Sequence, residues 1–216
     1  MRHLSSDLDC LSGLENDTES SAHATGNDNN ATGGSATPVA DRFGNLVSVT
    51  HSVNSGFGSG MVVDGLGFVL NNRMPYFSLE EEAVNVLVPG KRTRHTVNPA
   101  LAMKDGKPFL AWNTPGGDNQ PQAMLQAFLA IVEFGMNVQQ AIEAPRLRYF
   151  TGRHVKMEER FPLQVREELA RRGHEIEVLN AFSRTVGGAQ GIQVDQEQGT
   201  FQGGADPRRD GVALGY

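Results

Sequence analysis

Two adjacent glycines separate an apolar strand pattern from a helix pattern. They lie in residues 112 to 129, which read WNTPGGDNQPQAMLQAFL. Because Gly116 and Gly117 have no Cβ atom, their N–H groups can converge on one point at the start of the helix. Converging N–H groups stabilise the oxyanion that forms in acyl transfer. The plainer interpretation, a strand-to-helix turn that needs positive φ angles, is favoured by composition alone.

Other residues that could carry chemistry form no recognisable set. The glycine-rich stretch GFGSG at 56 to 60 is followed by MVV, a strand pattern, whereas a nucleotide-binding loop requires a helix there. None of the histidines at 51, 95, 154 and 174 pairs with another at metal-ligand spacing. The single cysteine, Cys10, excludes an internal disulfide and a cysteine-based zinc cluster. We therefore predict no metal and no cofactor.

The elements that must position the glycine pair are mixed. Residues 45 to 53 alternate apolar and polar as a half-buried strand, and 67 to 72 read as its partner strand. Asp105-Gly106 between two apolar runs predicts a tight hairpin of 97 to 103 with 107 to 112. The remaining patterns predict helices at 121–134, 137–145 and 162–173, and strands at 174–180, 191–197 and 199–207. This order predicts an α+β fold.

The helix from Pro121 to about Phe134 carries a broad apolar face, which predicts that it is mostly buried. The residues of that face are Met124, Leu125, Phe128, Leu129, Ile131 and Val132. Asn137 is a candidate N-cap for the next helix, and Pro145 is its candidate terminator.

The chain divides into a leader and one domain. Residues 1–37 are expected to be a disordered or mobile leader, because 13 to 36 are rich in Asn, Asp, Ser, Thr and Gly. Residues 38–216 are expected to form the folded domain, beginning near Pro38. The net charge of −6 argues against nucleic acid or anionic membranes as partners. No secretory or membrane-spanning pattern is visible, so the default compartment is the cytoplasm.

A collinear set of motifs carries a family resemblance from about Asp41 to Tyr216. The motifs are ADRFGNLVSVTHSVNSGFGSGMVV, GFVLNNR, PGKR, KDGKPFLAWNTPGGDNQPQ, EFGMNVQQAIEAPR and the ending GADPRRDGVALGY. In this order they resemble the small, C-terminal subunit of the gamma-glutamyltranspeptidase family, including its cephalosporin-acylase-like branch. The resemblance implies an N-terminal-nucleophile (Ntn) hydrolase, an αββα sandwich of which this chain supplies the small-subunit part. It also implies autoproteolysis and a large subunit as partner in a heterodimer.

The resemblance assigns expected roles to several residues. Gly116 and Gly117 would form the oxyanion hole. Asn54 matches a substrate-contacting asparagine, and Ser52 falls where the family commonly has a hydroxyl that supports the nucleophile. The nucleophile of the family is a threonine freed by self-cleavage, whose own α-amine acts as the general base, so no cofactor is needed.

The substrate-binding positions depart from the family pattern. Arg73 and Tyr76 stand where standard transpeptidases place a Gln or Glu and an Asp on the α-amino group, and His95 and Thr96 replace a serine pair. Losing an acidic partner and gaining an arginine disfavours an ammonium group and favours a carboxylate or a neutral acyl group. A glutaryl-like acyl amide is therefore expected beside a γ-glutamyl one.

The nucleophile position also departs from the pattern. The family threonine usually lies seven residues before the aspartate that is Asp41 here, and that position is Gly34. Thr37, Ser35 and Thr32 remain as displaced candidates, of which Thr37 is the best. Pro38 argues against Thr37, because a strand that begins there needs N–H groups that proline does not offer.

Two functions follow. The first is a γ-glutamyltransferase or acyl-amide hydrolase of glutathione metabolism, with this chain a fragment that needs a large subunit. The alternative is a catalytically inactive remnant or a partner-dependent non-catalytic subunit. The intact motifs favour the first, and Gly34 favours the second.

Overall fold

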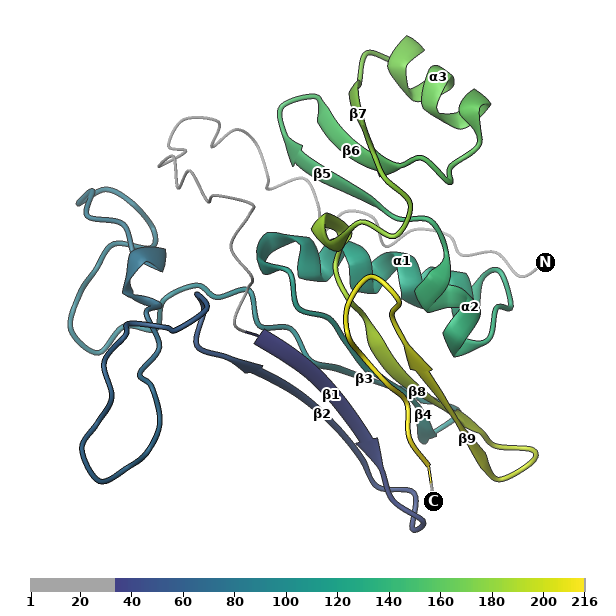
Figure 1. Cartoon of the computed structure of the whole chain (residues 1–216), viewed down its shortest axis with the longest axis horizontal. Coiled ribbons are helices and arrows are strands. Elements are labelled where there is room, and N and C mark those ends of the chain that lie inside the picture. The colour runs from purple at the N-terminus through teal and green to yellow at the C-terminus, as the bar shows by residue number, and fades with distance from the viewer. Residues whose placement is uncertain (1–33, 216) are drawn as a thin grey trace.

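The computed structural model describes residues 34–215, which fold into mixed sheets and helices (Figure 1). The predicted leader mostly lies outside the described residues. Its last four residues do not, because strand β1 spans Gly34–Ala40. The boundary expected near Pro38 therefore falls inside a strand.

A two-stranded hairpin opens the described part of the chain. Strand β1 pairs antiparallel with β2, Leu46–Ser52, in a register that sets Gly34 opposite Ser52. The carboxylate of Asp41 closes the turn by accepting the N–H groups of Phe43 and Asn45, each at 2.9 Å. Pro38 is tolerated because β1 has a single partner strand, so alternate N–H groups of β1 face away from the ladder. The strand expected at this position is therefore compatible with Pro38.

A four-stranded antiparallel sheet forms the centre of the fold. Its strands are β3 (Ala100–Lys104), β4 (Lys107–Asn113), β8 (Gln190–Asp195) and β9 (Thr200–Ala205), in the order β3-β4-β8-β9. The predicted hairpin is confirmed: Asp105 and Gly106 both have positive φ, at 52° and 76°, as a tight primed turn requires.

Two helices cover one face of this sheet and the hairpin β1-β2 lies on the other. Helix α1 spans Gln120–Val132 and α2 spans Val138–Glu143. The Trp112 ring of β4 stacks on Phe128 of α1, with ring centroids 5.3 Å apart. The next residue, Asn113, points to the opposite face and donates its Nδ2 to Val49 O of β2 at 2.7 Å. The layers are helices, sheet and hairpin, three of the four in an αββα sandwich.

The apolar core lies between α1, α2 and the sheet. It contains Leu110, Ala130, Ile131, Val138, Ala141, Ile142 and Ala189, all buried. The Asn137 N-cap is confirmed, since its side chain and that of Gln140 form a reciprocal capping box. The prediction of a mostly buried α1 was too broad. Leu125 is 57% exposed and Val132 is 42% exposed, because the sheet contacts only one side of the helix.

A smaller sheet follows α2. It has the order β5-β6-β7, with β5 at Leu147–Thr151, β6 at His154–Glu158 and β7 at Glu175–Leu179. Helix α3, Leu163–Arg171, connects β6 to the parallel strand β7, which confirms the third predicted helix. Gln122 and Gln126 of α1 form hydrogen bonds with backbone groups of β5, so this sheet is fixed to the N-terminal half of α1.

Residues 53–99 form an arm with little regular structure, which leaves the end of β2 and lies apart from the central sheet (Figure 1). The strand predicted at 67 to 72 is wrong: only an isolated bridge joins Val62 to Val69, and β2 pairs with β1 instead. Four glycines of the arm between residues 58 and 67 have positive φ, which breaks a continuous ladder. The arm contains one short 3₁₀ helix, η2, at Met74–Tyr76.

A buried ion cluster joins the two sheets. It consists of Arg146, Glu158, Asp206 and Arg208, none more than 3% exposed. Arg208 donates from Nε and Nη2 to the two oxygens of Glu158, at 2.7 and 2.6 Å, and Arg146 pairs with Asp206. Burial by itself raises the pKa of Asp206 and of Glu158, but the arginines outweigh it, so both pKa values lie below the ordinary range.

Candidate active site

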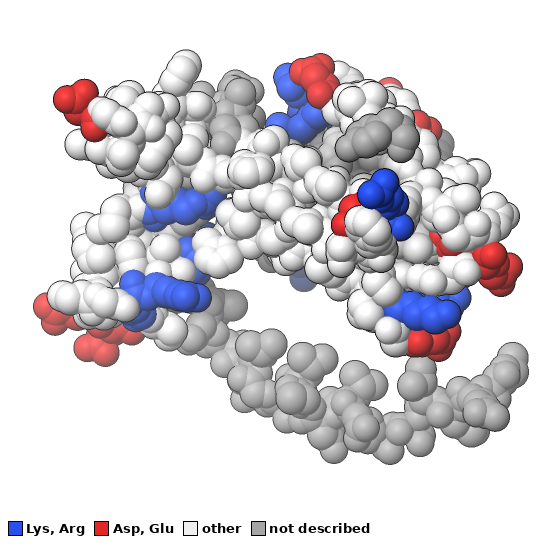
Figure 2. All heavy atoms as spheres, turned by 90° about the horizontal axis from the view of Figure 1, so that it is seen from below, with Lys and Arg blue, Asp and Glu red and all other residues white. Residues whose placement is uncertain are grey.

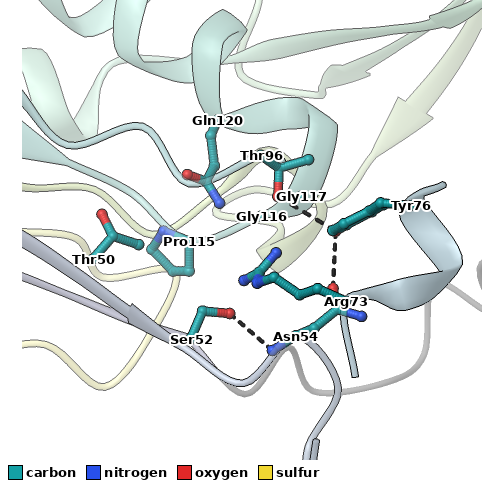
Figure 3. A pocket seen from close by; sticks show the side chains of 11 residues that line it. Thr50, Ser52, Asn54, Arg73, Tyr76, Thr96, Pro115, Gly116, Gly117 and Gln120 are labelled. Carbon is teal, nitrogen blue, oxygen red and sulfur yellow. Dashed lines mark hydrogen bonds between the residues drawn. The ribbon is translucent and has the colours of Figure 1, made fainter. Parts of the chain in front are cut away.

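A small pocket lies where the end of β2, the arm and the glycine pair meet (Figure 3). Its cavity volume is about 70 Å³. It is lined by Gly34, Thr50, Ser52, Asn54, Arg73, Tyr76, Thr96, Pro115, Gly116, Gly117 and Gln120. Segments that are up to 86 residues apart in the sequence therefore contribute to one site. Seven of the nine residues predicted for the site line it.

The two predicted site residues that do not line the pocket are Thr37 and His95. Gly34 faces the pocket, and side chains alternate along a strand, so Thr37 and Ser35 lie on the opposite face of β1, where both are exposed. His95 is exposed next to the buried Thr96. Thr32, the third candidate nucleophile, lies outside the described residues.

Gly34 lies directly beside the polar groups of the pocket. A Cβ atom built on it would be 3.4 Å from Ser52 Oγ and 3.3 Å from His51 O. Gly34 is not among the residues with positive φ, so its backbone suits any L-residue. The position that the resemblance gives to the nucleophile thus faces the pocket, and it carries no hydroxyl.

The glycine pair is both a positive-φ turn and a pair of free donors. Gly116 has a φ of 140° and Gly117 a φ of 59°, so the two interpretations of the sequence are compatible. Thr114 Oγ1 donates to Pro115 O at 2.9 Å, and Asn119 N donates to Gly116 O at 3.2 Å. A trans peptide directs its N–H opposite to its carbonyl, so both glycine N–H groups point away from these contacts. Within the described part of the chain, neither N–H donates a hydrogen bond.

A hydrogen-bonded set connects β2 to the arm. Asn54, with a φ of 80°, donates its N–H to Ser52 Oγ at 3.1 Å and its Nδ2 to Asn72 Oδ1 at 3.0 Å. Tyr76 donates its hydroxyl to Asn54 Oδ1 at 2.9 Å and lies 3.5 Å from Thr96 Oγ1. Both ends of the Asn54 amide are therefore bonded within the protein, and it forms part of the pocket wall.

Two buried polar atoms of the pocket have no hydrogen-bond partner among the described residues. They are Nη1 of Arg73 and Oγ1 of Thr50. The guanidinium of Arg73 lies 5.6 Å from the Tyr76 ring centroid, and that of Arg94 lies 5.3 Å from it. Arg94 is in turn paired with Asp118 at 2.9 Å, whereas Arg73 points into the pocket (Figure 3). The unpaired cation predicts an anionic oxygen as its ligand.

Sequence reasoning missed Thr50 and Gln120. Thr50 could have been found, because it lies two residues before Ser52 on a strand and so shares its face. Gln120 accepts the N–H of Asn98 through Oε1 at 3.1 Å, a contact between distant segments that has no local signal.

Three features of the described residues bear on other kinds of site. Residues 34–215 contain no group of three or more side chains able to hold a metal ion. No helix in that range is long and apolar enough to cross a bilayer. Cationic and anionic side chains are scattered on the face shown in Figure 2, without a continuous basic area.

The helices, the central sheet and the hairpin have the layered arrangement of the Ntn-hydrolase fold. The Gamma-glutamyltranspeptidase family matches residues 7–216, and the chain belongs to this family. It is 41% identical over 184 residues to the glutathione hydrolase-like YwrD proenzyme of Bacillus subtilis, covering 82% of this chain and 34% of that protein. The chain spans about a third of the length of the curated relatives it matches.

Solved structures show the same fold. Cephalosporin acylase from Bacillus halodurans matches with a TM-score of 0.73 and 38% identity, covering 79% of this chain and 32% of that one. Gamma-glutamyltranspeptidase from Pseudomonas nitroreducens, complexed with L-DON, matches with a TM-score of 0.73 and 28% identity, covering 86% of this chain and 100% of that one. The predicted family and the α+β Ntn-hydrolase fold are confirmed.

Proposed function

We propose that this chain supplies the acyl site of an amide hydrolase or acyltransferase that takes γ-glutamyl or glutaryl-like amides. One observation carries the proposal: Nη1 of Arg73 and the N–H groups of Gly116 and Gly117 line the same pocket, and none of them has a hydrogen-bond partner among the described residues. The arginine would hold a carboxylate of the acyl group. The two N–H groups would hold the oxygen of the scissile carbonyl as it gains negative charge.

The reaction also needs a nucleophile and a general base. In the proposed mechanism, self-cleavage frees a threonine, whose hydroxyl attacks the amide carbonyl while its own amine takes the proton. The amine of the substrate leaves, and water or another amine then accepts the acyl group. Thr37 remains the candidate for this role. Self-cleavage before it would remove the first three residues of β1, and the shortened strand would then have to turn the Thr37 side chain toward the pocket.

A large subunit of the same family is the proposed partner. Two observations support it. The chain aligns with about a third of the length of the curated relatives it matches, and apolar side chains of α1 lie exposed. Such side chains on one helix face are typical of a surface that another element covers.

A second candidate function is amide binding without catalysis. It is favoured by Gly34, which faces the pocket without a hydroxyl while Ser35 and Thr37 face away. In that case the chain would bind the same acyl amides and leave them intact.

Intact mass and two substrates separate the two functions. The purified chain is measured alone and with a large subunit of the family, and both samples are assayed with γ-glutamyl and glutaryl anilides. Loss of the first 36 residues, together with hydrolysis that Thr37→Val abolishes, would establish Thr37 as the nucleophile. Loss of 31 or 34 residues would indicate Thr32 or Ser35 instead. An uncut chain that binds glutaryl anilide without hydrolysing it would establish the second function.

A further inference from the structure

Thr114 lies behind the glycine pair and is completely buried. Its Oγ1 accepts the N–H of Gly188 at 3.0 Å and lies 2.9 Å from Pro115 O. An N–H can only donate and a carbonyl can only accept, so the hydroxyl proton must be directed at Pro115 O. The chemistry of the two partners thus fixes the direction of both hydrogen bonds.

This hydroxyl sets the orientation of one peptide group. Pro115 O is held on the Thr114 side, and the peptide is trans, so Gly116 N–H is directed to the other side. Glycine at 116 does not oppose a rotation of this peptide group, because both signs of φ are open to it. A contact outside Gly116 must therefore hold the N–H in place, and the Thr114 hydroxyl is that contact.

Gly188, which donates its N–H to Thr114, is held in place by the buried ion cluster. Arg146 Nη1 donates to Val186 O at 3.0 Å, and Ala189 N donates to Asp206 Oδ2 at 2.8 Å. These bonds hold both ends of the loop that contains Gly187 and Gly188. The fit is close, since a Cβ atom on Gly187 would lie 2.8 Å from Thr114 Oγ1.

We propose that Thr114 is a positioning residue for the oxyanion hole, acting through the Pro115 carbonyl to direct Gly116 N–H at the substrate oxygen. The ion cluster supports it through Gly188. The proposal rests on the proposed function of Gly116 and Gly117, but the orientation of the peptide can be tested without that function.

Three variants and two ligands test this role. Thr114→Val keeps the shape and removes the hydroxyl, Thr114→Ser keeps the hydroxyl, and Thr114→Cys keeps a weak donor. The ligands are butyrate, which has only the carboxylate expected on Arg73, and 3-carboxypropylphosphonate monomethylated on the phosphonate, which keeps that carboxylate and adds a tetrahedral anion at the oxyanion hole. Affinities are measured by calorimetry, and ligand-free crystal structures give the orientation of the peptide between 115 and 116.

We expect Thr114→Val to weaken phosphonate binding about 10- to 100-fold, as for loss of one hydrogen bond to a charged group. Its butyrate affinity should stay within about twofold, and the peptide should turn or adopt two orientations. Thr114→Ser should bind like the wild type. Thr114→Cys should give an intermediate phosphonate affinity. If Thr114→Val does not fold, the affinity of Thr114→Cys tests whether the hydroxyl is needed.

The proposal would be overturned if Thr114→Val bound the phosphonate with wild-type affinity and kept the wild-type peptide orientation. If only Thr114→Cys folds, wild-type phosphonate affinity in that variant would overturn it. If the wild type binds neither ligand, the proposed function fails. The ligand-free crystal structures then still decide whether Thr114 orients the peptide.

Discussion

The buried ion cluster and the pocket differ in the hydrogen bonding of their polar atoms. In the cluster, each of the four carboxylate oxygens of Glu158 and Asp206 accepts at least two hydrogen bonds. In the pocket, Arg73 Nη1 and Thr50 Oγ1 are buried without a partner among residues 34–215, and two glycine N–H groups donate to no group in that range. Burying an unpaired donor lowers the stability of the folded chain. A ligand that bonded to these pocket atoms would remove that penalty.

This difference separates structural charges from functional ones. Both regions contain arginines with buried nitrogen atoms, so the type of residue does not distinguish them. Their carboxylate partners do: Arg146 and Arg208 are both paired with buried carboxylates, whereas Arg73 is paired with no carboxylate among residues 34–215. Substitutions in the cluster should therefore affect folding, and substitutions in the pocket should affect binding.

The largest effect is expected from breaking the cluster. Glu158→Gln removes one of the two carboxylates that pair with Arg208 and leaves Asp206 as the single buried carboxylate for two buried guanidinium groups. We expect a loss of about 3–5 kcal/mol in the free energy of unfolding, measured by urea denaturation. Glu177→Gln is the matched control, because Glu177 pairs with His154 on the surface and should cost no more than about 1 kcal/mol. Equal effects would show that the cluster is not a structural centre.

Acid should weaken the same cluster more gradually. The pKa values of Glu158 and Asp206 are lowered in the folded chain, so both carboxylates bind fewer protons there than in the unfolded chain. Their stabilisation is complete above the unfolded values of about 4.3 and 3.9, and it is lost as the pH falls through the lower folded values. Thermal denaturation from pH 7 to pH 3 should show stability falling below about pH 4, and Glu158→Gln should reduce that dependence.

The pocket should show the reverse behaviour. Arg73→Met keeps much of the side-chain volume and removes the unpaired cation. We expect about a 10- to 100-fold loss of affinity for glutaranilic acid, with an unfolding free energy equal to or above that of the wild type. Arg92→Met, on the exposed surface of the arm, is the matched control and should change neither quantity. A loss of stability without a loss of affinity in Arg73→Met would place this arginine with the structural charges.

The smallest effect is expected at the exposed pair of Arg94 and Asp118. The two side chains are 55% and 62% exposed, so their ion pair should contribute at most about 1 kcal/mol. Asp118→Asn should lower glutaranilic acid affinity by only a few-fold, and 0.5 M salt should have the same effect on the wild type. A loss of glutaranilic acid affinity of tenfold or more that does not depend on salt would contradict this expectation. It would mean that the ion pair does more than connect the arm to the turn that contains Asp118.

The sequence predicted local features well and long-range ones poorly. The Asp105-Gly106 hairpin and the Asn137 cap were predicted because their signals lie within a few residues. The strand at 67 to 72 failed because apolar residues between glycines were taken for a ladder. The cluster could not be predicted, since Arg146 and Asp206 meet only after two sheets are in place.

The site was predicted through motif order and corrected through strand geometry. Ser52, Arg73, Gly116 and Gly117 all line the pocket, as the resemblance implied. Thr37 does not line it, although period-2 alternation from Gly34 already sets the two on opposite faces of one strand. The unpaired Arg73 nitrogen could not be read from the sequence, because the partners of a side chain depend on the whole fold.

A crystal structure of the chain with glutaranilic acid tests the central claim most directly. We predict the ligand carboxylate on Nη1 of Arg73 and the amide carbonyl oxygen within hydrogen-bond distance of the Gly116 and Gly117 N–H groups, with the carbonyl carbon facing Gly34. If the amide is hydrolysed, bound glutarate should keep its distal carboxylate on Arg73. A pocket that stays empty at saturating ligand, or a carboxylate bound away from Arg73, would contradict the claim.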